Sequence, residues 1–408
     1  MIVLGVGGGI AAYKAVEVLR RLTESGHQVQ VVPTAAALQF VAAPTWAALS
    51  GRPVASDLWQ DAHQVPHVSI GRAADLVLVV PATADLMARA AHGLADDLLT
   101  NTLLTATCPV VYVPAMHTEM WQNAATRDNV AVLRSRGAII VEPAEGRLTG
   151  TDSGKGRLPE PDAIADIALA TLARHQRTGP AGPDLAGRTV VVSAGGTREP
   201  IDPVRFVGNR SSGRQGYALA ATAAARGARV ILVSANVALP EPAGVSVVRV
   251  GTAAELGEAV RAAAAAADVV VMAAAVADFR PSMPRISKIK KGGDVAAAPA
   301  PLELERTADV LAALVTDPPR AGQLVVGFAA ETGDATGDWL TLGRAKLAAK
   351  GCDLLVVNQV GDGLGFEVAD NAAVVLGADG TETVVPVGPK SVLADIVWDL
   401  VAAQLPAR

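Results

Sequence analysis

Continuous apolar runs alternate with longer amphipathic stretches along the first part of the chain. A strand that is apolar at every position is buried on both faces, which is typical of a parallel sheet covered by helices. Amphipathic stretches with a helical period predict the covering helices. The pattern places strands at 2–6, 29–33, 76–80, 110–113 and 138–141, and helices near 10–24, 83–92, 98–106 and 120–135.

A second α/β series follows the stretch HQRTGPAGPDLAGR, residues 175–188, whose prolines and glycines are typical of a linker. Two strands flanking ADG near the end of the chain, 372–376 and 382–385, predict a hairpin. The other elements are strands at 189–193, 230–234, 245–250, 269–273, 324–328 and 354–357, with helices near 213–226, 253–267, 307–316, 337–350 and 390–403. We therefore expect two doubly wound, Rossmann-like three-layer α/β domains, residues 1–176 and 188–408, joined by a linker at 177–187.

The composition limits the classes of partner. Half of the 408 residues are apolar, 18% are charged, and the formal net charge is −5, which gives no general attraction to nucleic acid or to anionic membranes. Two cysteines, Cys108 and Cys352, cannot build a disulfide framework, and this favours the reducing cytoplasm. The apolar N-terminus has no basic region and predicts a first strand rather than a signal peptide. The longest alanine run lies among charged residues, so no membrane span is expected.

Two glycine turns follow first strands and open helices, as anion-binding turns do. GVGGGIAAYK (5–14) fails the dinucleotide pattern because Ile10 holds the place of the third glycine, and the second strand ends in VVPT without an acidic residue. SAGGT (193–197) repeats this arrangement in the second domain. These turns argue against NAD and leave a mononucleotide open, with an ordinary structural turn as the alternative. Thr34 and Pro81–Thr83 also follow strands, where such ligands bind.

The octapeptide PAMHTEMW, residues 114–121, continues the strand PVVYV. Its large side chains predict either a helix start that plugs the core or a lid over a ligand at the strand end. In the second domain, Ser211–Gly213 supplies hydroxyls and free amides suited to a phosphate, or an ordinary helix cap. Asp278 ends a strand, where it could hold Mg²⁺. Lys288, Lys290 and Lys291 form either a clamp on a triphosphate or a solvated charge run.

Three motifs in order, GGGIAAYK, HVSIGRAADLVLVVPATADL (67–86) and PAMHTEMW, resemble the flavin-dependent cysteine decarboxylase family. With the second domain, the whole chain resembles bacterial bifunctional phosphopantothenoylcysteine decarboxylase/phosphopantothenate–cysteine ligases. The resemblance implies a flavodoxin-like first domain that binds FMN, and His67 as the catalytic base. It implies FMN contacts from Gly8, Gly9, Thr34, Pro81, Ala82 and Thr83, a site lining that includes Asp96 and 98–100, and substrate contacts from Ala115, Met116, His117, Met120 and Trp121.

This chain departs from the family pattern at two positions of the first domain. His117 stands where the family has Asn, and we expect it to bind the substrate carboxylate through an N–H donor. The flap LTGTDSGKGRLPEP, residues 148–161, has Gly150 or a near neighbour where the family has a catalytic Cys that protonates an enethiolate. Thr151, Asp152 or Ser153 could replace that thiol. Cys108 is expected to be a core residue.

The second domain resembles the ligase half, which activates 4′-phosphopantothenate with CTP to an acyl-cytidylate that cysteine then attacks. The resemblance implies that Asn209 stabilises the acyl-cytidylate step, with Arg205 nearby, and that Lys288 and Asp278 meet the triphosphate and Mg²⁺. Substrate contacts are implied at Ser211, Ser212 and Gly213. The implied CTP contacts are Ala273, Ala274, Asp278, Lys288, Ala308, Asp309, Val310, Phe328, Lys346 and Lys350. Lys346 and Lys350 share a helix face, so both could point at one ligand.

Three functions compete for this sequence. The first is a bifunctional enzyme of coenzyme A biosynthesis that acts on the small molecules 4′-phosphopantothenate, L-cysteine and CTP. The second is an active ligase whose FMN-binding domain is a catalytically silent scaffold, which the missing flap Cys and His117 suggest. The third is a non-catalytic flavoprotein, against which Asn209, Asp278 and Lys288 argue. The resemblance also implies a large homo-oligomer, with trimeric flavin domains and dimeric ligase domains.

Overall fold

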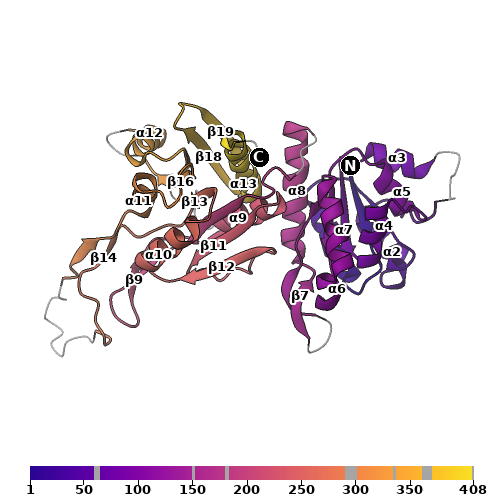
Figure 1. Cartoon of the computed structure of the whole chain (residues 1–408), viewed down its shortest axis with the longest axis horizontal. Coiled ribbons are helices and arrows are strands. Elements are labelled where there is room, and N and C mark those ends of the chain that lie inside the picture. The colour runs from indigo at the N-terminus through magenta and orange to yellow at the C-terminus, as the bar shows by residue number, and fades with distance from the viewer. Residues whose placement is uncertain are drawn as a thin grey trace. The chain divides into compact units, whose positions relative to one another are not determined.

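The computed structural model describes residues 1–58, 65–148, 152–179, 183–289, 301–333, 337–360 and 370–406. The chain divides into two compact units, drawn in Figure 1 from indigo to yellow along the sequence. The first unit consists of Met1–Ala186 together with Ala224–Ala228 and Pro242–Gly244, and the second unit consists of the remaining residues.

A five-stranded parallel sheet in the order β2-β1-β3-β4-β5 forms the centre of the first unit. Because β1 pairs with β2 on one side and with β3 on the other, the strand order reverses there. This is the flavodoxin-like order, in which ligands bind beyond the carboxyl ends of the strands at the reversal. The strands are β1 (Ile2–Val6), β2 (Val29–Pro33), β3 (Leu76–Ala82), β4 (Val110–Pro114) and β5 (Ile139–Ile140).

Helices cover both faces of this sheet, because alternate strand residues point to opposite sides. Leu4 and Leu78 pack in one apolar cluster with residues of α1 and α8, whereas Val3 and Val77 pack in another with residues of α4, α5 and α7. The first fold prediction, a three-layer α/β domain, is therefore confirmed. The helices are α1 (Ala12–Glu24), α2 (Ala43–Ser50), α3 (Pro66–Ala73), α4 (Ala84–His92), α5 (Leu98–Thr105), α6 (Thr118–Gln122), α7 (Ala124–Ser135) and α8 (Pro161–Thr178), with a short 3-10 turn η1 (Ala37–Gln39).

The helix expected at 120–135 is two helices, α6 and α7. They separate at Asn123, whose side-chain oxygen accepts a hydrogen bond from the Ala125 amide (3.0 Å) and starts α7. Helices α2, α3 and α8 were not predicted. Helix α8 extends to Thr178, and beyond it Leu185 is buried, while Asp184 is hydrogen-bonded to the buried Arg226 (2.9 Å).

An eight-stranded sheet in the order β12-β11-β8-β13-β16-β17-β18-β19 forms the centre of the second unit. The first six strands are parallel in the doubly wound Rossmann order, with the reversal between β8 and β13. Strands β18 and β19 add the antiparallel hairpin predicted around ADG. The strands are β8 (Thr189–Gly195), β11 (Arg229–Ala235), β12 (Val245–Val250), β13 (Val269–Met272), β16 (Leu324–Glu331), β17 (Leu354–Gln359), β18 (Asp370–Gly377) and β19 (Glu382–Pro389).

Helices again flank the sheet: α9 (Arg214–Ala225), α10 (Ala253–Ala264), α11 (Val310–Thr316), α12 (Trp339–Lys350) and α13 (Lys390–Gln404). Two short antiparallel pairs, absent from the prediction, stand apart from it: β9 (Arg198–Pro200) with β10 (Phe206–Gly208), and β14 (Phe279–Pro281) with β15 (Leu304–Arg306). Strands β9 and β14 extend from the end of this unit away from α13 (Figure 1). Within the described residues no helix is long and apolar enough to cross a bilayer.

Candidate active sites

Four segments meet at the carboxyl edge of the first sheet. Each directly follows one of the strands β1 to β4, and each is joined to a neighbour by a backbone hydrogen bond. The bonds run from Gly7 N to Pro81 O (3.1 Å), from Thr34 N to Val6 O (2.9 Å) and from Ala115 N to Ala82 O (3.3 Å). The predicted contacts Gly8, Gly9, Thr34, Pro81–Thr83 and Ala115 therefore lie in adjoining segments around the reversal between β1 and β3.

The turn before α1 suits an anion. Among the described residues, the amides of Gly8, Ile10 and Ala11 donate no hydrogen bond, and the first turn of α1 has neither an acidic residue nor a side-chain cap. A Cβ atom on Gly8 would lie 2.2 Å from the Cβ of Ala36, so this glycine permits close packing of the chain. The nearest atom to a Cβ on Gly9 would be 3.5 Å away, which leaves room beside that residue. Free amides at a helix start bind phosphate.

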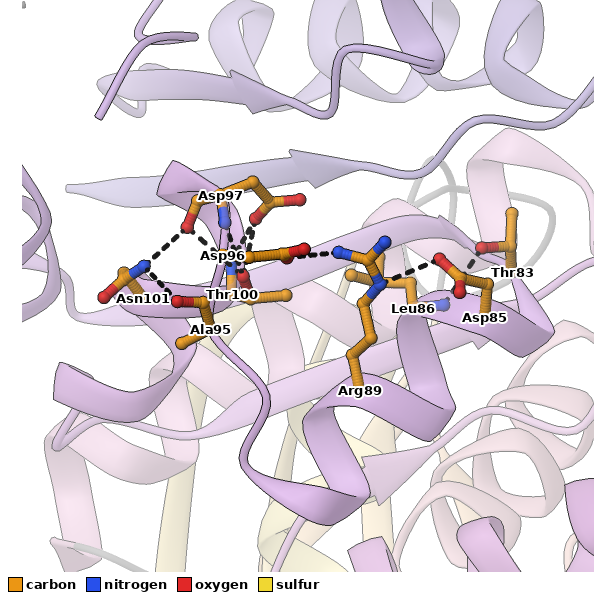
Figure 2. Close-up of polar contacts among 9 residues, drawn as sticks. All are labelled: Thr83, Asp85, Leu86, Arg89, Ala95, Asp96, Asp97, Thr100 and Asn101. Atoms are coloured by element: carbon orange, nitrogen blue, oxygen red, sulfur yellow. Dashed lines mark hydrogen bonds and ion pairs between the residues drawn. The ribbon is translucent and has the colours of Figure 1, made fainter. Parts of the chain in front are cut away.

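Two threonine hydroxyls, from the segments after β2 and β3, add donors to those of the glycine turn. Thr34 Oγ accepts from the Ala37 amide (3.2 Å), and Thr83 Oγ accepts from the Leu86 amide (3.3 Å), where it caps α4 (Figure 2). Within the described part of the chain neither hydroxyl donates a hydrogen bond, so each proton is available to an anion. Amides and hydroxyls together supply uncharged donors of the kind that hold the phosphate of a mononucleotide.

The loop between α4 and α5 is fixed by its own polar contacts (Figure 2). Asp97 and Thr100 form a reciprocal cap of α5, with the Thr100 amide 2.7 Å from Asp97 Oδ1. Arg89 pairs with Asp85 (3.1 Å) and with Asp96. The expected site lining at 96 and 98–100 is thus partly engaged elsewhere: Asp96 turns to Arg89, and residues 98–100 are buried.

His67 is the second residue of α3. This helix leads into β3, and its amino end contacts Thr105 at the carboxyl end of α5, the helix that leads into β4. His67 therefore lies toward the amino edge of the sheet, away from the phosphate turn. The Nδ1 atom of His67 is buried and has no hydrogen-bond partner among the described residues. The His67 carbonyl accepts from Thr105 Oγ (2.8 Å), which joins α3 to α5. The unpartnered nitrogen can accept a hydrogen bond or a proton, as the base role predicted for His67 requires.

The flap packs directly on the octapeptide PAMHTEMW. It is a hairpin of β6 (Ala144–Arg147) and β7 (Ser153–Arg157), and the Met116 amide donates to Gly156 O (3.0 Å). A Cβ on Gly156 would lie 2.1 Å from Met116 O, and one on Gly154 would lie 2.4 Å from Thr118 Oγ, so both glycines are needed for this approach.

Both interpretations of the octapeptide apply, to different side chains. Trp121 is 9% exposed within the core cluster, and Met116 packs against the same cluster. His117 and Met120 are exposed (46% of the His117 side chain), and His117 Nδ1 lies 4.0 Å from Asp152 Oδ2 on the flap. The segment is therefore anchored by its tryptophan and presents its histidine to the flap.

Asp152 and Ser153 remain as residues that could replace the missing thiol, whereas Gly150 and Thr151 lie outside the described residues. Cys108 precedes β4, at the amino edge of the sheet and therefore opposite the site. Burial raises the pKa of its thiol to about 11, so it stays protonated near neutral pH and packs with the core. This position and environment agree with the core role predicted for Cys108.

In the second unit, the chain continues to pair beyond the ends of β8 and β13. Ala275 donates to Gly195 O (2.8 Å), and the Ala277 amide donates to Thr197 Oγ (2.9 Å). Ala274 donates to Ser193 Oγ (3.1 Å). The predicted contacts Ala273, Ala274 and Asp278 thus lie on a segment that runs beside the glycine turn, at the reversal of the strand order.

Asn209 reaches the same segment, since its Nδ2 donates to Val276 O (2.9 Å). The carbonyl of the exposed Asp278 accepts from the Thr307 amide (3.0 Å), which brings residues 308–310 next to it. Ser211 Oγ accepts from the Gly213 amide (3.3 Å) just before α9, with Ser212 half-buried between them. Among the described residues no cluster of three potential metal ligands exists. One carboxylate nevertheless suits Mg²⁺ that is also bound by substrate phosphates.

Lys346 and Lys350 each pair with a carboxylate rather than pointing at one shared site. Lys346 Nζ lies 2.8 Å from Glu331 Oε1, and Lys350 pairs with Asp309. Asp309 also caps α11 by accepting from the Ala312 amide (3.0 Å). The predicted contact Phe328 is half-buried on β16, and Lys288 is exposed. Lys290 and Lys291 lie outside the described residues.

Asp309 generates a pH-dependent prediction. Burial alone raises its pKa, but the Ala312 hydrogen bond and the Lys350 charge outweigh this and hold the pKa below the ordinary 3.8. A lowered pKa adds stability that is present above pH 3.8 and is lost as the pH falls through the folded-state value. Asp309→Asn keeps a helix cap, so it should unfold at lower urea than the parent at about pH 7. That difference should shrink as the pH falls below 3.8 and through the folded-state pKa. A difference that is constant with pH would contradict the assignment.

Comparison with known proteins finds a separate family for each of the two units. Residues 1–173 match the Flavoprotein family, and residues 185–405 match the DNA/pantothenate metabolism flavoprotein C-terminal domain. The chain is 57% identical over 411 residues to the coenzyme A biosynthesis bifunctional protein CoaBC of Mycobacterium tuberculosis, covering 99% of this chain and 96% of that protein. It is 41% identical over 395 residues to CoaBC of Bacillus subtilis, covering 95% and 93%.

Among solved structures, the C-terminal domain of a CoaBC protein is 35% identical and covers 55% of this chain and 98% of that chain, with a TM-score of 0.45. The two family matches account for both units, and the curated relatives match along nearly the whole chain. The protein therefore belongs to the family of coenzyme A biosynthesis bifunctional proteins CoaBC.

Proposed function

We propose that this chain catalyses two consecutive steps of coenzyme A biosynthesis. The second unit joins 4′-phosphopantothenate to L-cysteine with CTP, releasing CMP and pyrophosphate. The first unit decarboxylates the resulting 4′-phosphopantothenoylcysteine to 4′-phosphopantetheine. Similarity to bifunctional relatives along the whole chain carries the proposal. Each unit also has its candidate residues at a reversal of strand order, where α/β folds bind ligands.

FMN is the cofactor proposed for the first unit. Its phosphate would be held by the amides of Gly8, Ile10 and Ala11 and by the hydroxyls of Thr34 and Thr83, which lack other acceptors among the described residues. Bound FMN supplies the electron sink that a cysteine carboxylate lacks, by accepting electrons from the thiol side of the substrate and returning them. His67, with its buried and unpartnered nitrogen, would take up a proton as base.

His117 and the flap would hold the substrate in this unit. A histidine N–H donates to a carboxylate as the amide of asparagine does, and more strongly when the ring is protonated. The flap places Asp152 across from His117. Asp152, directly or through water, is then the flap group that could deliver the proton for which relatives use a thiol.

In the second unit, nucleotide activation is chemically required because a free carboxylate does not form an amide in water. Arg205 and Lys288 would neutralise charge on the triphosphate, and Asp278 would bind Mg²⁺ together with the phosphates. Asn209, whose amide is already anchored at Val276 O, would stabilise the acyl-cytidylate step. The amine of cysteine then attacks the acyl carbon and CMP leaves.

We further propose that the enzyme works in the cytoplasm as a large homo-oligomer, as the resemblance to its family implies. The alternative function is an active ligase whose flavin-binding unit is catalytically silent. One observation favours this alternative: the described part of the flap contains no cysteine, and Asp152 faces His117 instead.

Incubation of the purified protein with 4′-phosphopantothenate, cysteine, CTP and Mg²⁺ tests the proposed function. Mass spectrometry should detect 4′-phosphopantetheine, carbon dioxide and CMP, because both units act in sequence. Accumulation of 4′-phosphopantothenoylcysteine would support the silent flavin unit. The absence of any product would contradict the ligase and the proposal as a whole.

His117→Ala should raise the KM for 4′-phosphopantothenoylcysteine roughly tenfold or more, because a hydrogen bond to a charged group is lost. His117→Asn is the matched control, since it retains a donor and should keep most of the affinity. Ligase activity, measured by pyrophosphate release, should not change in either variant. Unaltered decarboxylation kinetics in His117→Ala would rule out His117 as the carboxylate-binding residue.

A further inference from the structure

Asp202 lies in the turn between β9 and β10, and its carboxylate is buried beside the candidate ligase residues. Its side chain has no solvent exposure. Asp202 Oδ1 accepts from the amides of Val204 (2.8 Å) and Arg205 (2.8 Å), and Oδ2 accepts from the amide of Ile289 (3.1 Å). The Arg205 guanidinium is a further partner, 3.4 Å from Oδ2.

Two of these bonds are local to the turn, but the bond to Ile289 spans 87 residues of sequence. Two more contacts join the same segments: Arg285 N donates to Ile201 O (2.8 Å), and Arg205 donates through its guanidinium to Ile289 O (3.3 Å). The segment that carries Lys288 is therefore held against the turn that carries Arg205 by contacts on both sides of Lys288.

The charge state of Asp202 supports this arrangement. Burial by itself raises the pKa of a carboxyl group, but three backbone N–H donors and Arg205 outweigh it and hold the pKa of Asp202 below its ordinary value. The group is therefore ionised at neutral pH. We call the contacts of Asp202 with Val204, Arg205 and Ile289 the clasp. Hydrogen bonds to an ionised acceptor are stronger than neutral ones, so the clasp is firm although it lies outside the main sheet.

We propose that Asp202 is a positioning residue of the ligase, which sets Arg205 and Lys288 side by side toward the triphosphate of the nucleotide. This inference rests on the proposed ligase function. Asp202 accepts hydrogen bonds from the backbone amide of Arg205 and from that of Ile289, the residue after Lys288. One carboxylate therefore fixes the backbone from which both cationic side chains extend. A lysine on a loop otherwise loses considerable side-chain and backbone freedom when it meets a ligand. The clasp removes part of that cost before CTP binds.

The clasp is separate from the packing that holds the second unit together. The buried apolar cluster on the α10 side of its sheet is built from β8, β11, β13 and α10 with their neighbours and contains none of the residues 201–205 or 285–289. Loss of the clasp should therefore alter the rate of the ligase more than the stability of the fold.

Asp202→Asn tests the proposal, because the amide retains the shape but replaces one acceptor oxygen with a donor that faces N–H groups. The rate of acyl-cytidylate formation, measured as pyrophosphate release from CTP and 4′-phosphopantothenate without cysteine, should fall roughly tenfold or more. The KM for cysteine should not change, since cysteine enters after this step. Hydrogen exchange of the Ile289 amide should become faster. Decarboxylation of supplied 4′-phosphopantothenoylcysteine in the same protein should keep its parental rate.

Two further variants keep the test decisive. Ile289→Pro removes the donor from the other end of the long-range bond and should reproduce the slower pyrophosphate release, even if Asp202→Asn were to misfold. Asp317→Asn is the matched control, since that exposed carboxylate pairs with Arg261 in the same unit (2.5 Å) and should leave the ligase unchanged. Parental rates in both Asp202→Asn and Ile289→Pro would overturn the positioning role. A parent protein without pyrophosphate release would instead contradict the ligase function itself.

Discussion

Parallel pairing of the first strand of each unit with neighbours on both sides is the constraint on which the rest of the molecule depends. Strand β1 pairs with β2 and β3, and β8 pairs with β11 and β13. The connections leaving the two sides of such a strand diverge, and they open a crevice at the carboxyl edge. Since the central strands β1, β3, β8 and β13 are buried on both faces, their polar groups occur mainly where the strands end.

The two units use this edge in different ways. In the first, the glycine turn and two threonines supply uncharged donors, and a hairpin flap packs on the segment after β4. In the second, the chain continues to pair past the ends of β8 and β13, and the candidate residues Arg205 and Lys288 lie in loops outside the main sheet. The first arrangement suits a tightly held cofactor, whereas the second suits a nucleotide and a substrate that enter and leave in each cycle.

The sequence predicted the sheets well because apolar runs are a direct signal of buried strands. Helix α8 was missed although Ile164, Ala168 and Leu172 repeat with a helical spacing, because the glycines and prolines after it dominated the interpretation. The pairing of Lys346 and Lys350 with Glu331 and Asp309 could not be predicted, because a shared helix face fixes a direction and not a partner.

Asp202 shows the same limit. An aspartate before proline predicts the local turn bonds to Val204 and Arg205, but no sequence pattern indicates the bond to Ile289, which depends on how a distant loop folds back. Trp121 is the converse case: its position beside His117 suggested a ligand contact, yet its ring belongs to the core. Which residues are fixed by distant contacts or by the core is thus visible only in the structure.

The central claim is that each unit performs one half of the reaction at its own strand-order reversal. Product analysis of His67→Ala and Asn209→Ala in the full chain tests it most directly. We expect His67→Ala to convert 4′-phosphopantothenate, cysteine and CTP to 4′-phosphopantothenoylcysteine and to stop there. Asn209→Ala should form no product from those substrates but should decarboxylate supplied 4′-phosphopantothenoylcysteine. Loss of both activities in either correctly folded variant would contradict the separation of the two sites.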